Sequence, residues 1–339
     1  MGIRKPNLPH LSNMRRTCLA FLCFFMLLTT SGAQEEQTLI AQSNLVRVPT
    51  LVRDATGAVV FGLHAADFVI EDDGVPQTVH LDEAAEDEPV SLMIAVQCGR
   101  KAPNEYKRIT GLAAMLDPIL SNPENEGAVL FFDSKLDLVQ DFTSDGERVE
   151  NQLKKLPWGD HDAAIMDAVA YASRLLGRRP EGRKRVLLLI SETRDHGSKF
   201  TTLESALGAI NNNDVSIYTI PFAPYLSQQL DDLRGSNREQ WSPVIDLWAR
   251  MQELRQAMRK NIPHTLASIT GGEYQLFLSR NGFEDHLIDF ANHLHNRYEL
   301  SFEPKNPHPG LHQIRVRLRD PKSNETLIFR TTYWVAPRE

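Results

Sequence analysis

The chain has 339 residues, and its 44 acidic residues outnumber its 37 basic ones, which gives a formal net charge of −7. Nucleic acids and anionic membrane surfaces bind clustered Lys and Arg, so we expect neither as a partner. With only three cysteines, the fold cannot depend on a disulfide framework and must be stabilised by the core that a chain of this length can bury.

The first 33 residues have the order of a secretory signal. An apolar run from Cys18 to Leu28 lies between basic residues and the small residues Ser31 and Ala33. This order predicts export to the periplasm or the medium, with cleavage after Ala33, from a start at Met1 or Met14. The alternative is an uncleaved anchor, but the run is shorter than the roughly 20 residues of a spanning helix, so we expect no membrane span in the mature chain. The basic residues are Arg4, Lys5, Arg15 and Arg16.

Both ends of the remaining chain predict β structure. After a polar arm over 34–44, segment 45–88 contains two runs typical of strands, Leu45–Arg53 and Asp67–Asp72. Segment 298–339 predicts more strands, separated by turns that contain proline. A small sheet with one apolar face needs a partner surface, so we expect these two segments to pair as a small β-sandwich. The strands expected near the end are 297–304, 311–319 and 326–335.

The middle of the chain, 89–297, alternates between apolar runs and helical patterns. Runs that are apolar at successive positions are typical of strands covered on both faces of a parallel sheet. The alternation predicts an α/β fold with a doubly wound, mostly parallel sheet, inserted into the β-sandwich. The expected strands are 90–96, 127–132, 136–141, 185–191, 215–220 and 274–278, and the expected helices are 105–120, 144–155 with Ser144 as its cap, 164–176, 201–211, a short one ending at Gly271-Gly272, and 283–296.

A long insertion, 222–261, interrupts the alternation. After Pro243 its apolar residues recur at helical spacing and form a broad stripe. We expect this stripe to pack on the domain, and the alternative is that it faces a partner. The stripe contains Val244, Leu247, Trp248, Met251, Leu254 and Met258.

Ligands of a doubly wound sheet bind at the carboxyl ends of its strands, next to the topological switch point. The expected site is therefore the turn Gln97–Arg100, with the loop Gly159–Asp167 and the strand end at Glu192 beside it. This arrangement resembles a von Willebrand factor A domain, in which the first strand ends in Asp-x-Ser-x-Ser, a later loop reads Gly-Gly-Thr-x-x-x-Asp, and the fourth strand ends in Asp. The resemblance implies a ligand-binding face at these positions.

The side chains at the metal-binding positions of that family have changed. Aligned on Gly99, Val96, Cys98 and Arg100 replace the Asp and the two Ser, Ala163 replaces the Thr, and Glu192 replaces the last Asp. Mg²⁺ needs oxygen ligands, which Val96, Cys98 and Ala163 do not offer, while Arg100 adds a positive charge. The resemblance therefore implies a degenerate metal ion-dependent adhesion site with no cofactor, although a divalent cation stays open. We expect Arg100 to hold either Glu192 or a partner's carboxylate.

Most of the mature chain also resembles a family of A-domain-related proteins described from Acidobacteria. Val-Arg-Asp-x-x-Gly, Leu-x-x-x-Asp-Phe-x-Ile-x-Glu-Asp-Gly and Tyr-x-Leu-x-Phe-x-Pro recur in that family. They are matched here by Val52–Gly57, Leu63–Gly74 with its doubled Asp72 and Asp73, and Tyr298–Pro304. This resemblance brings no defined biochemical role.

Two other classes of function stay open beside a binding module. Cys98 could be an enzyme's nucleophile, but no local signature supplies a base, and a small buried cysteine is usually inert. Loop side chains could form a rearranged site for Zn²⁺ or Mn²⁺, although no zinc motif is present. These are Asp160, His161, Asp162, Glu192, Asp195 and His196. We therefore expect a non-enzymatic module that binds a protein or an envelope glycan.

Overall fold

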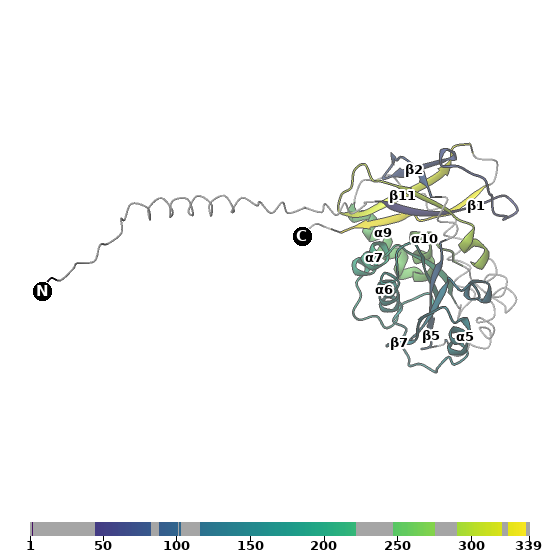
Figure 1. Cartoon of the computed structure of the whole chain (residues 1–339), viewed down its shortest axis with the longest axis vertical. Coiled ribbons are helices and arrows are strands. Elements are labelled where there is room, and N and C mark those ends of the chain that lie inside the picture. Colours follow the sequence, from purple (N-terminus) through teal and green to yellow (C-terminus); the bar gives the residue numbers. More distant parts are fainter. Residues whose placement is uncertain are drawn as a thin grey trace. The chain divides into compact units, whose positions relative to one another are not determined.

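The computed structural model describes residues 45–82, 88–100, 116–221, 247–274, 290–320 and 325–336, together with Gly2 and Ala102 (Figure 1). The expected signal segment and arm lie outside these residues. Outside them too are residues 105–115 of the helix expected over 105–120 and residues 222–246 of the insertion. The same holds for the expected strand 274–278 beyond Tyr274 and for the expected helix 283–296 before residue 290. Within the described part, no helix combines the length and apolar character needed to cross a bilayer.

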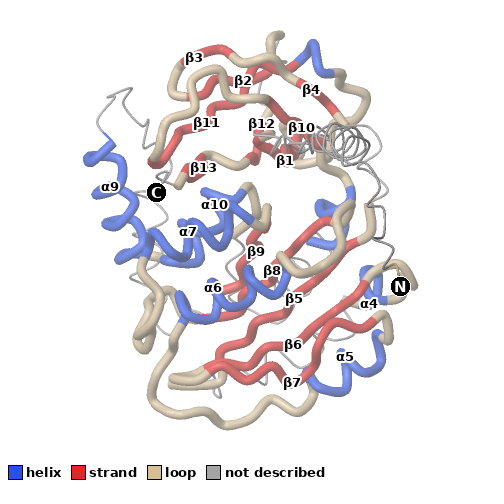
Figure 2. Tube along the Cα trace, turned by 60° about the vertical axis from the view of Figure 1, so that its left-hand side comes forward, coloured by secondary structure: helices blue, strands red, loops and turns tan. Residues whose placement is uncertain are grey.

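One sheet has five strands in the order β7-β6-β5-β8-β9 (Figure 2). β5 pairs in parallel with β6 and β8, β8 pairs in parallel with β9, and β7 is antiparallel at the edge. Numbered along the chain, this is the 3-2-1-4-5 order of a doubly wound sheet, so the expected fold class is confirmed and the switch point lies between β5 and β8. The strands are β5 (Val90–Gln97), β6 (Glu126–Phe132), β7 (Leu136–Thr143), β8 (Lys184–Ser191) and β9 (Val215–Pro221).

Helices cover both faces of this sheet, and so β5 is buried at every position. Four helices line one face, α6 (Ile165–Leu176), α7 (Leu203–Asn212), α9 (Leu247–Lys260) and α10 (Ile262–Thr270). The other face packs on α4 (Asp117–Leu120), α5 (Gly146–Leu153) and the helical residues 290–295.

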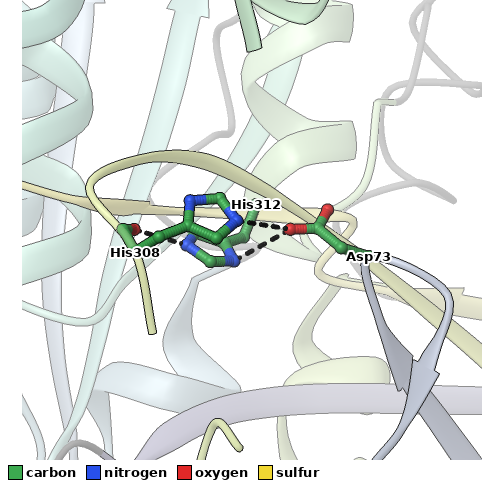
Figure 3. A group of neighbouring side chains, drawn as sticks. All are labelled: Asp73, His308 and His312. Atoms are coloured by element: carbon green, nitrogen blue, oxygen red, sulfur yellow. Dashed lines mark hydrogen bonds and ion pairs between the residues drawn. The ribbon is translucent and has the colours of Figure 1, made fainter. Parts of the chain in front are cut away.

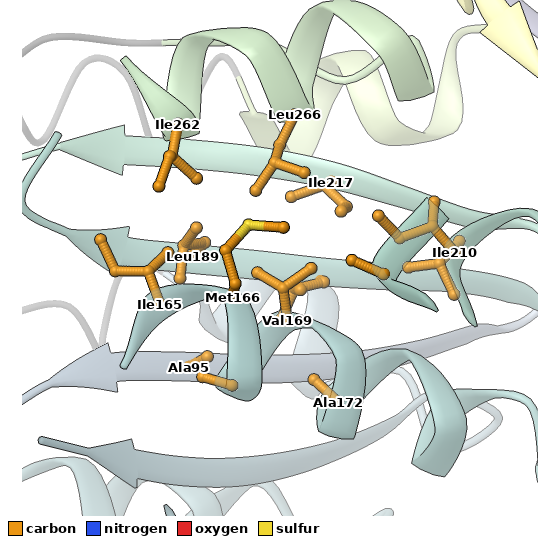
Figure 4. Close-up of a cluster of buried hydrophobic side chains, with 14 of the residues drawn as sticks. Ala95, Ile165, Met166, Val169, Ala172, Leu189, Ile210, Ile217, Ile262 and Leu266 are labelled. Carbon is orange, nitrogen blue, oxygen red and sulfur yellow. The ribbon is translucent and has the colours of Figure 1, made fainter. Parts of the chain in front are cut away.

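The core under the four helices joins them through interdigitating aliphatic side chains. Figure 4 shows Ile165 and Val169 of α6 facing Leu189 of β8, with Ile262 and Leu266 of α10 above Ile217 of β9. The insertion's stripe joins the same core through Met251, Leu254 and Met258. The expectation that it packs on the domain is therefore confirmed for these residues.

One helix begins at a different cap from the one expected. Asp145, not Ser144, is the N-cap of α5, and its carboxylate accepts a hydrogen bond from the Arg148 amide. Both residue types are good caps, and an ionised carboxylate also interacts favourably with the helix N-terminus.

Strands from the two ends of the chain form two antiparallel sheets, one containing β1 and the other containing the neighbouring strands β2 and β11 (Figure 1). Their facing sides enclose a separate core that includes Val48, Phe68, Leu300 and Val316. The expected sandwich of both chain ends is confirmed. One sheet has the order β12 (Thr326–Phe329), β1 (Val46–Arg53), β10 (Tyr298–Phe302), β4 (His80–Leu81), and the other β13 (Thr332–Val335), β11 (Gly310–Leu318), β2 (Phe68–Asp72), β3 (Val75–Pro76).

The last expected strand, 326–335, is wrong as a single strand, because the chain changes sheets at Arg330. β12 pairs with β1, whereas β13 pairs with β11. Arg330 is buried between them, and its guanidinium donates to the Thr332 carbonyl at 3.0 Å and to Asp214 Oδ1 at 3.0 Å. The sequence did not reveal this break, because β12, the buried Arg330 and β13 together form one alternating pattern of apolar and polar residues.

A buried ionic network lies where the α/β unit returns to the sandwich. Glu273 is hydrogen-bonded to His293 Nδ1 at 2.9 Å and to Arg297 Nη2 at 2.9 Å, and all three residues are buried. Arg297 also lies over the ring of Tyr218. Although burial alone would raise it, the hydrogen bond from His293 and the charge of Arg297 hold the pKa of Glu273 below its usual value.

Candidate functional site

Three segments meet at the switch point: the turn 97–100 after β5, the loop 159–163 before α6, and the loop 192–198 after β8. We refer to them together as the switch-point site. The Gly159 amide donates to the Cys98 carbonyl at 2.9 Å, and the His196 amide donates to the Ala163 carbonyl at 3.0 Å. The structure thus brings together the three segments that the sequence pointed to.

Gln97 ties the ends of β5 and β8 together. Its side chain is fully buried, and Oε1 accepts a hydrogen bond from the Glu192 amide at 2.9 Å. Nε2 donates to Glu192 Oε1 at 3.3 Å and to the Gly99 carbonyl at 3.2 Å. The sequence analysis placed Gln97 in the expected turn but gave its side chain no role, because a glutamine at the end of an apolar run carries no signal of what it will face.

Arg100 forms an ion pair with Glu192 across the switch point. Its Nε lies 3.0 Å from Oε2, and the carboxylate side chain is only 5% exposed, compared with 31% for the arginine. The backbone of Arg100 is left-handed, with φ of +57°, and its amide donates to the Asp160 carbonyl at 2.7 Å. The expectation that Arg100 holds Glu192 is confirmed.

Val96 and Ala163 have no exposed surface and belong to the two cores of the sheet. Val96 packs on the side of α4 and α5, and Ala163 on the side of α6. Neither offers an oxygen atom to a cation. The residues at these positions therefore do not fit the octahedral oxygen shell that Mg²⁺ requires.

Cys98 is a buried structural residue. It is 4% exposed, and its Sγ lies 3.3 Å from the Phe132 carbonyl oxygen. Burial, with a smaller effect from the charge of Asp133, raises the pKa of the thiol to about 12. Burial thus favours the protonated thiol, whereas a nucleophilic cysteine needs an adjacent base or a lowered pKa.

We expect the Cys98 thiol to react slowly with iodoacetamide at pH 8, at least about a hundredfold more slowly than in the unfolded chain, because only the thiolate reacts. Mass spectrometry of the alkylated cysteine over time, with and without denaturant, measures this ratio. Alkylation of the folded chain at the unfolded rate would show that the thiol is accessible and ionised.

The carboxylates near the site hold its loops. Asp160 accepts hydrogen bonds from the Ser134 hydroxyl and from the Asp162 amide, and the Ser134 hydroxyl is the main reason that its pKa is lowered. Asp195 accepts from the Ile165 amide and the Ser198 hydroxyl, both at 3.0 Å, while burial raises its pKa. These bonds fix the start of α6 and the loop after β8.

The alternative metal site finds no converged ligand set here. His161 and His196 are exposed, Asp162 is half-buried, and Glu192 is paired with Arg100. Within the described residues, the ligand atoms of three Asp, Glu, His or Cys side chains gather within 4.8 Å of one another in one group, and that group lies in the sandwich.

Gly99 and Gly159, which the sequence analysis used only to mark the turn and the loop, let the segments of the site touch. A Cβ on Gly99 would lie 2.0 Å from the Asp162 carbonyl oxygen, and one on Gly159 would lie 2.6 Å from the Cys98 carbonyl carbon. Backbone therefore packs directly on backbone at the site. Glycine in a loop next to an expected site was the signal that could have found them.

Two exposed aromatic residues lie beside these segments. Trp158 directly precedes Gly159 and is 81% exposed, and Phe200, two residues after Ser198, is 88% exposed. The Phe200 amide donates to Asp167 Oδ1 at 3.2 Å, so its loop is fixed although its ring is not covered. We call Trp158 and Phe200 the aromatic pair.

No family model matches the sequence, and no curated protein matches it. Among solved structures, the chain is similar to an aerotolerance-related membrane protein from Bacteroides fragilis (16% identity, TM-score 0.40, 60% of this chain and 98% of that one). It is also similar to the vWF domain of the type V pili tip protein Mfa5 from Porphyromonas gingivalis (8% identity, TM-score 0.41, 61% and 95%). A third is the pilus adhesin SpaC from Lactobacillus rhamnosus GG (11% identity, TM-score 0.39, 73% and 34%). These similarities concern the fold alone.

Proposed function

We propose that the chain is an exported, non-enzymatic binding module whose A-type domain, 89–297, holds a protein or glycan partner at the switch-point site without a divalent cation. In this proposal 45–88 and 298–339 form the supporting sandwich, 1–33 is removed after Ala33, and the module belongs with the Acidobacterial proteins that its motifs resemble. The Arg100–Glu192 ion pair carries the proposal.

The pair supports metal independence through its charges. Glu192 is the one carboxylate at the positions that resemble the family's cation site, and the Arg100 guanidinium already neutralises it at 3.0 Å. A divalent cation there would meet a fixed positive charge and too few oxygen ligands. The other oxygen of the Glu192 carboxylate, Oε1, accepts a hydrogen bond from Gln97 Nε2.

The surroundings of the pair suit recognition of a partner. Exposed Trp and Phe side chains supply large apolar contact area and are enriched at the centres of binding surfaces. The aromatic pair lies on loops whose backbones are held by Asp167 and by the contact of Gly159 with Cys98. A loop whose backbone is already held loses little backbone conformational entropy when its side chains bind a partner.

The experiment is affinity capture from the organism's own envelope fraction, with the purified mature chain as bait and capture repeated in Mg²⁺ and in EDTA. We expect the same partner under both conditions and at least about a tenfold loss with Trp158→Ala combined with Phe200→Ala. Phe61→Ala is the matched control, since Phe61 is also exposed, at 68%, but lies in the sandwich segment.

Two outcomes contradict the proposal. Capture in Mg²⁺ that is lost in EDTA would favour the metal-dependent alternative. Equal loss with the control and with the double variant would show that exposed aromatic residues act nonspecifically. Calorimetric titration of Mg²⁺ and Mn²⁺ into the wild-type chain, with no heat of binding expected, tests the cation separately from the partner.

A further inference from the structure

A cluster of one aspartate and two histidines, Asp73, His308 and His312, lies in the sandwich, apart from the switch-point site (Figure 3). Asp73 is in the turn between β2 and β3, His312 is on β11, and His308 is in the loop that precedes β11. β2 and β11 are paired, with Asp72 opposite Ile314, which brings these distant parts of the sequence together.

We propose that Asp73, His308 and His312 form a zinc-binding site. Asp73 Oδ2 lies 3.1 Å from His312 Nδ1 and 3.3 Å from His308 Nε2, and the three ligand atoms all lie within 4.8 Å of one another. Zinc bonds of 2.0–2.1 Å in a tetrahedral shell place neighbouring ligand atoms about 3.3 Å apart. The spacing to the carboxylate oxygen is therefore that of a ligand set.

The hydrogen bond made by Nε2 of His312 leaves its other ring nitrogen, Nδ1, as the atom that can bind a metal ion. Nε2 lies 2.7 Å from the His308 carbonyl oxygen, so it carries a hydrogen, and Nδ1 faces the carboxylates. Nδ1 lies 3.1 Å from Asp73 Oδ2 and 3.2 Å from Asp72 Oδ1, and so a positive species, either a proton or a metal ion, must lie between them. A ligating imidazole usually donates its other N–H to a carbonyl or carboxylate in this way.

The carboxylates are oriented by bonds to their other oxygens. Asp73 Oδ1 accepts from the Gln313 amide at 3.0 Å and from Arg250, and Asp72 Oδ2 accepts from the Tyr333 hydroxyl at 2.8 Å. Oδ2 of Asp73 is thus the oxygen directed at both histidines. Asp73 has a left-handed backbone, with φ of +50°, which lets successive aspartates face the same cluster.

Charge and access also suit a cation. Two carboxylates face one guanidinium, that of Arg250, so the cluster is negative when its histidines are neutral. The His308 side chain is 46% exposed, whereas His312 is 1% exposed, so an ion can enter from the His308 side and keep water as a fourth ligand. Mixed imidazole and carboxylate ligands favour Zn²⁺ over Mg²⁺ or Ca²⁺.

The test is calorimetric titration of ZnCl₂ into the metal-free full chain, with Co²⁺ absorption as a spectroscopic readout. We expect one equivalent to bind with a Kd of roughly 10 µM or tighter, and His308→Ala to weaken it at least about tenfold. His308 is partly exposed, so this variant should fold, which circular dichroism checks. The matched control is His161→Ala combined with His196→Ala, two exposed histidines of the switch-point site, and it should keep the wild-type affinity.

The proposal is overturned if the wild-type chain binds no zinc at 100 µM, which would mean that protons alone hold the cluster. It is also overturned if His308→Ala keeps the wild-type affinity, or if the control variant alone loses zinc. None of these outcomes bears on partner binding at Arg100.

Discussion

Replacing Glu273 with alanine is expected to lower the free energy of unfolding by about 3–5 kcal/mol, the range found when one partner of a buried ion pair is removed. Glu273 is the acceptor between His293 and Arg297, and Arg297 is itself 4% exposed. Without the carboxylate, a buried guanidinium keeps its charge but loses the group that balances it. Urea unfolding at pH 7, followed by circular dichroism, measures the change.

A surface ion pair provides the control for this substitution. Glu204 pairs with Arg255, but both side chains are more than a third exposed. Glu204→Ala should therefore cost less than about 1 kcal/mol. Equal losses for Glu204→Ala and Glu273→Ala would mean that solvent reaches the buried network.

Replacing Gly99 with alanine is expected to destabilise the fold by about 3 kcal/mol and to abolish binding at the switch-point site. The new Cβ would lie 2.0 Å from the Asp162 carbonyl oxygen and 3.1 Å from that of Asp160. Both are backbone atoms, which cannot rotate away as a side chain can. The turn 97–100 and the loop 159–163 would have to separate, and the Arg100 amide would lose its acceptor. Urea unfolding and the capture experiment measure the two effects.

Gly208 offers a matched glycine-to-alanine change. It lies in α7, and nothing would come within 4 Å of its Cβ. Gly208→Ala should raise the stability by about 0.5–1 kcal/mol, because alanine is the better helix former. Wild-type stability and binding for Gly99→Ala would show that the two loops are not packed as described.

The sheet was predictable because a strand that is buried on both faces has apolar residues at successive positions. β5, with no polar face, reads as one apolar run, and the parallel strands β6, β8 and β9 are each preceded by a helical pattern. The exact residue at which a helix begins was harder to predict: Ser144 was expected as the N-cap of α5, and the neighbouring Asp145 takes that position. The change of sheet at Arg330 depends on Asp214, which is far away in the sequence and could not be inferred locally.

The residues of the candidate site that lie at or just after the ends of paired strands could be predicted. Contacts between loops that are far apart in the sequence could not. Glu192 directly follows β8 and Arg100 lies in the turn after β5, so the pairing of these parallel strands brings the two residues near each other. The packing of Gly99 depends on which loop covers the turn, and the sequence does not show this. The cluster of Asp73, His308 and His312 depends on the register of β2 against β11, and the spacing of two histidines does not reveal that register.

The pairing of β10 with β4 has a mechanical consequence. β4 is the last described strand before the α/β unit and β10 the first after it, and they lie antiparallel as neighbours. Tension applied through Val46 of β1 and Val335 of β13 acts first on the sandwich ladders. The two ends of the inserted unit are held side by side by this pairing, so we expect a pull on the chain to load the unit and its switch-point site only after the pairing of β4 with β10 breaks.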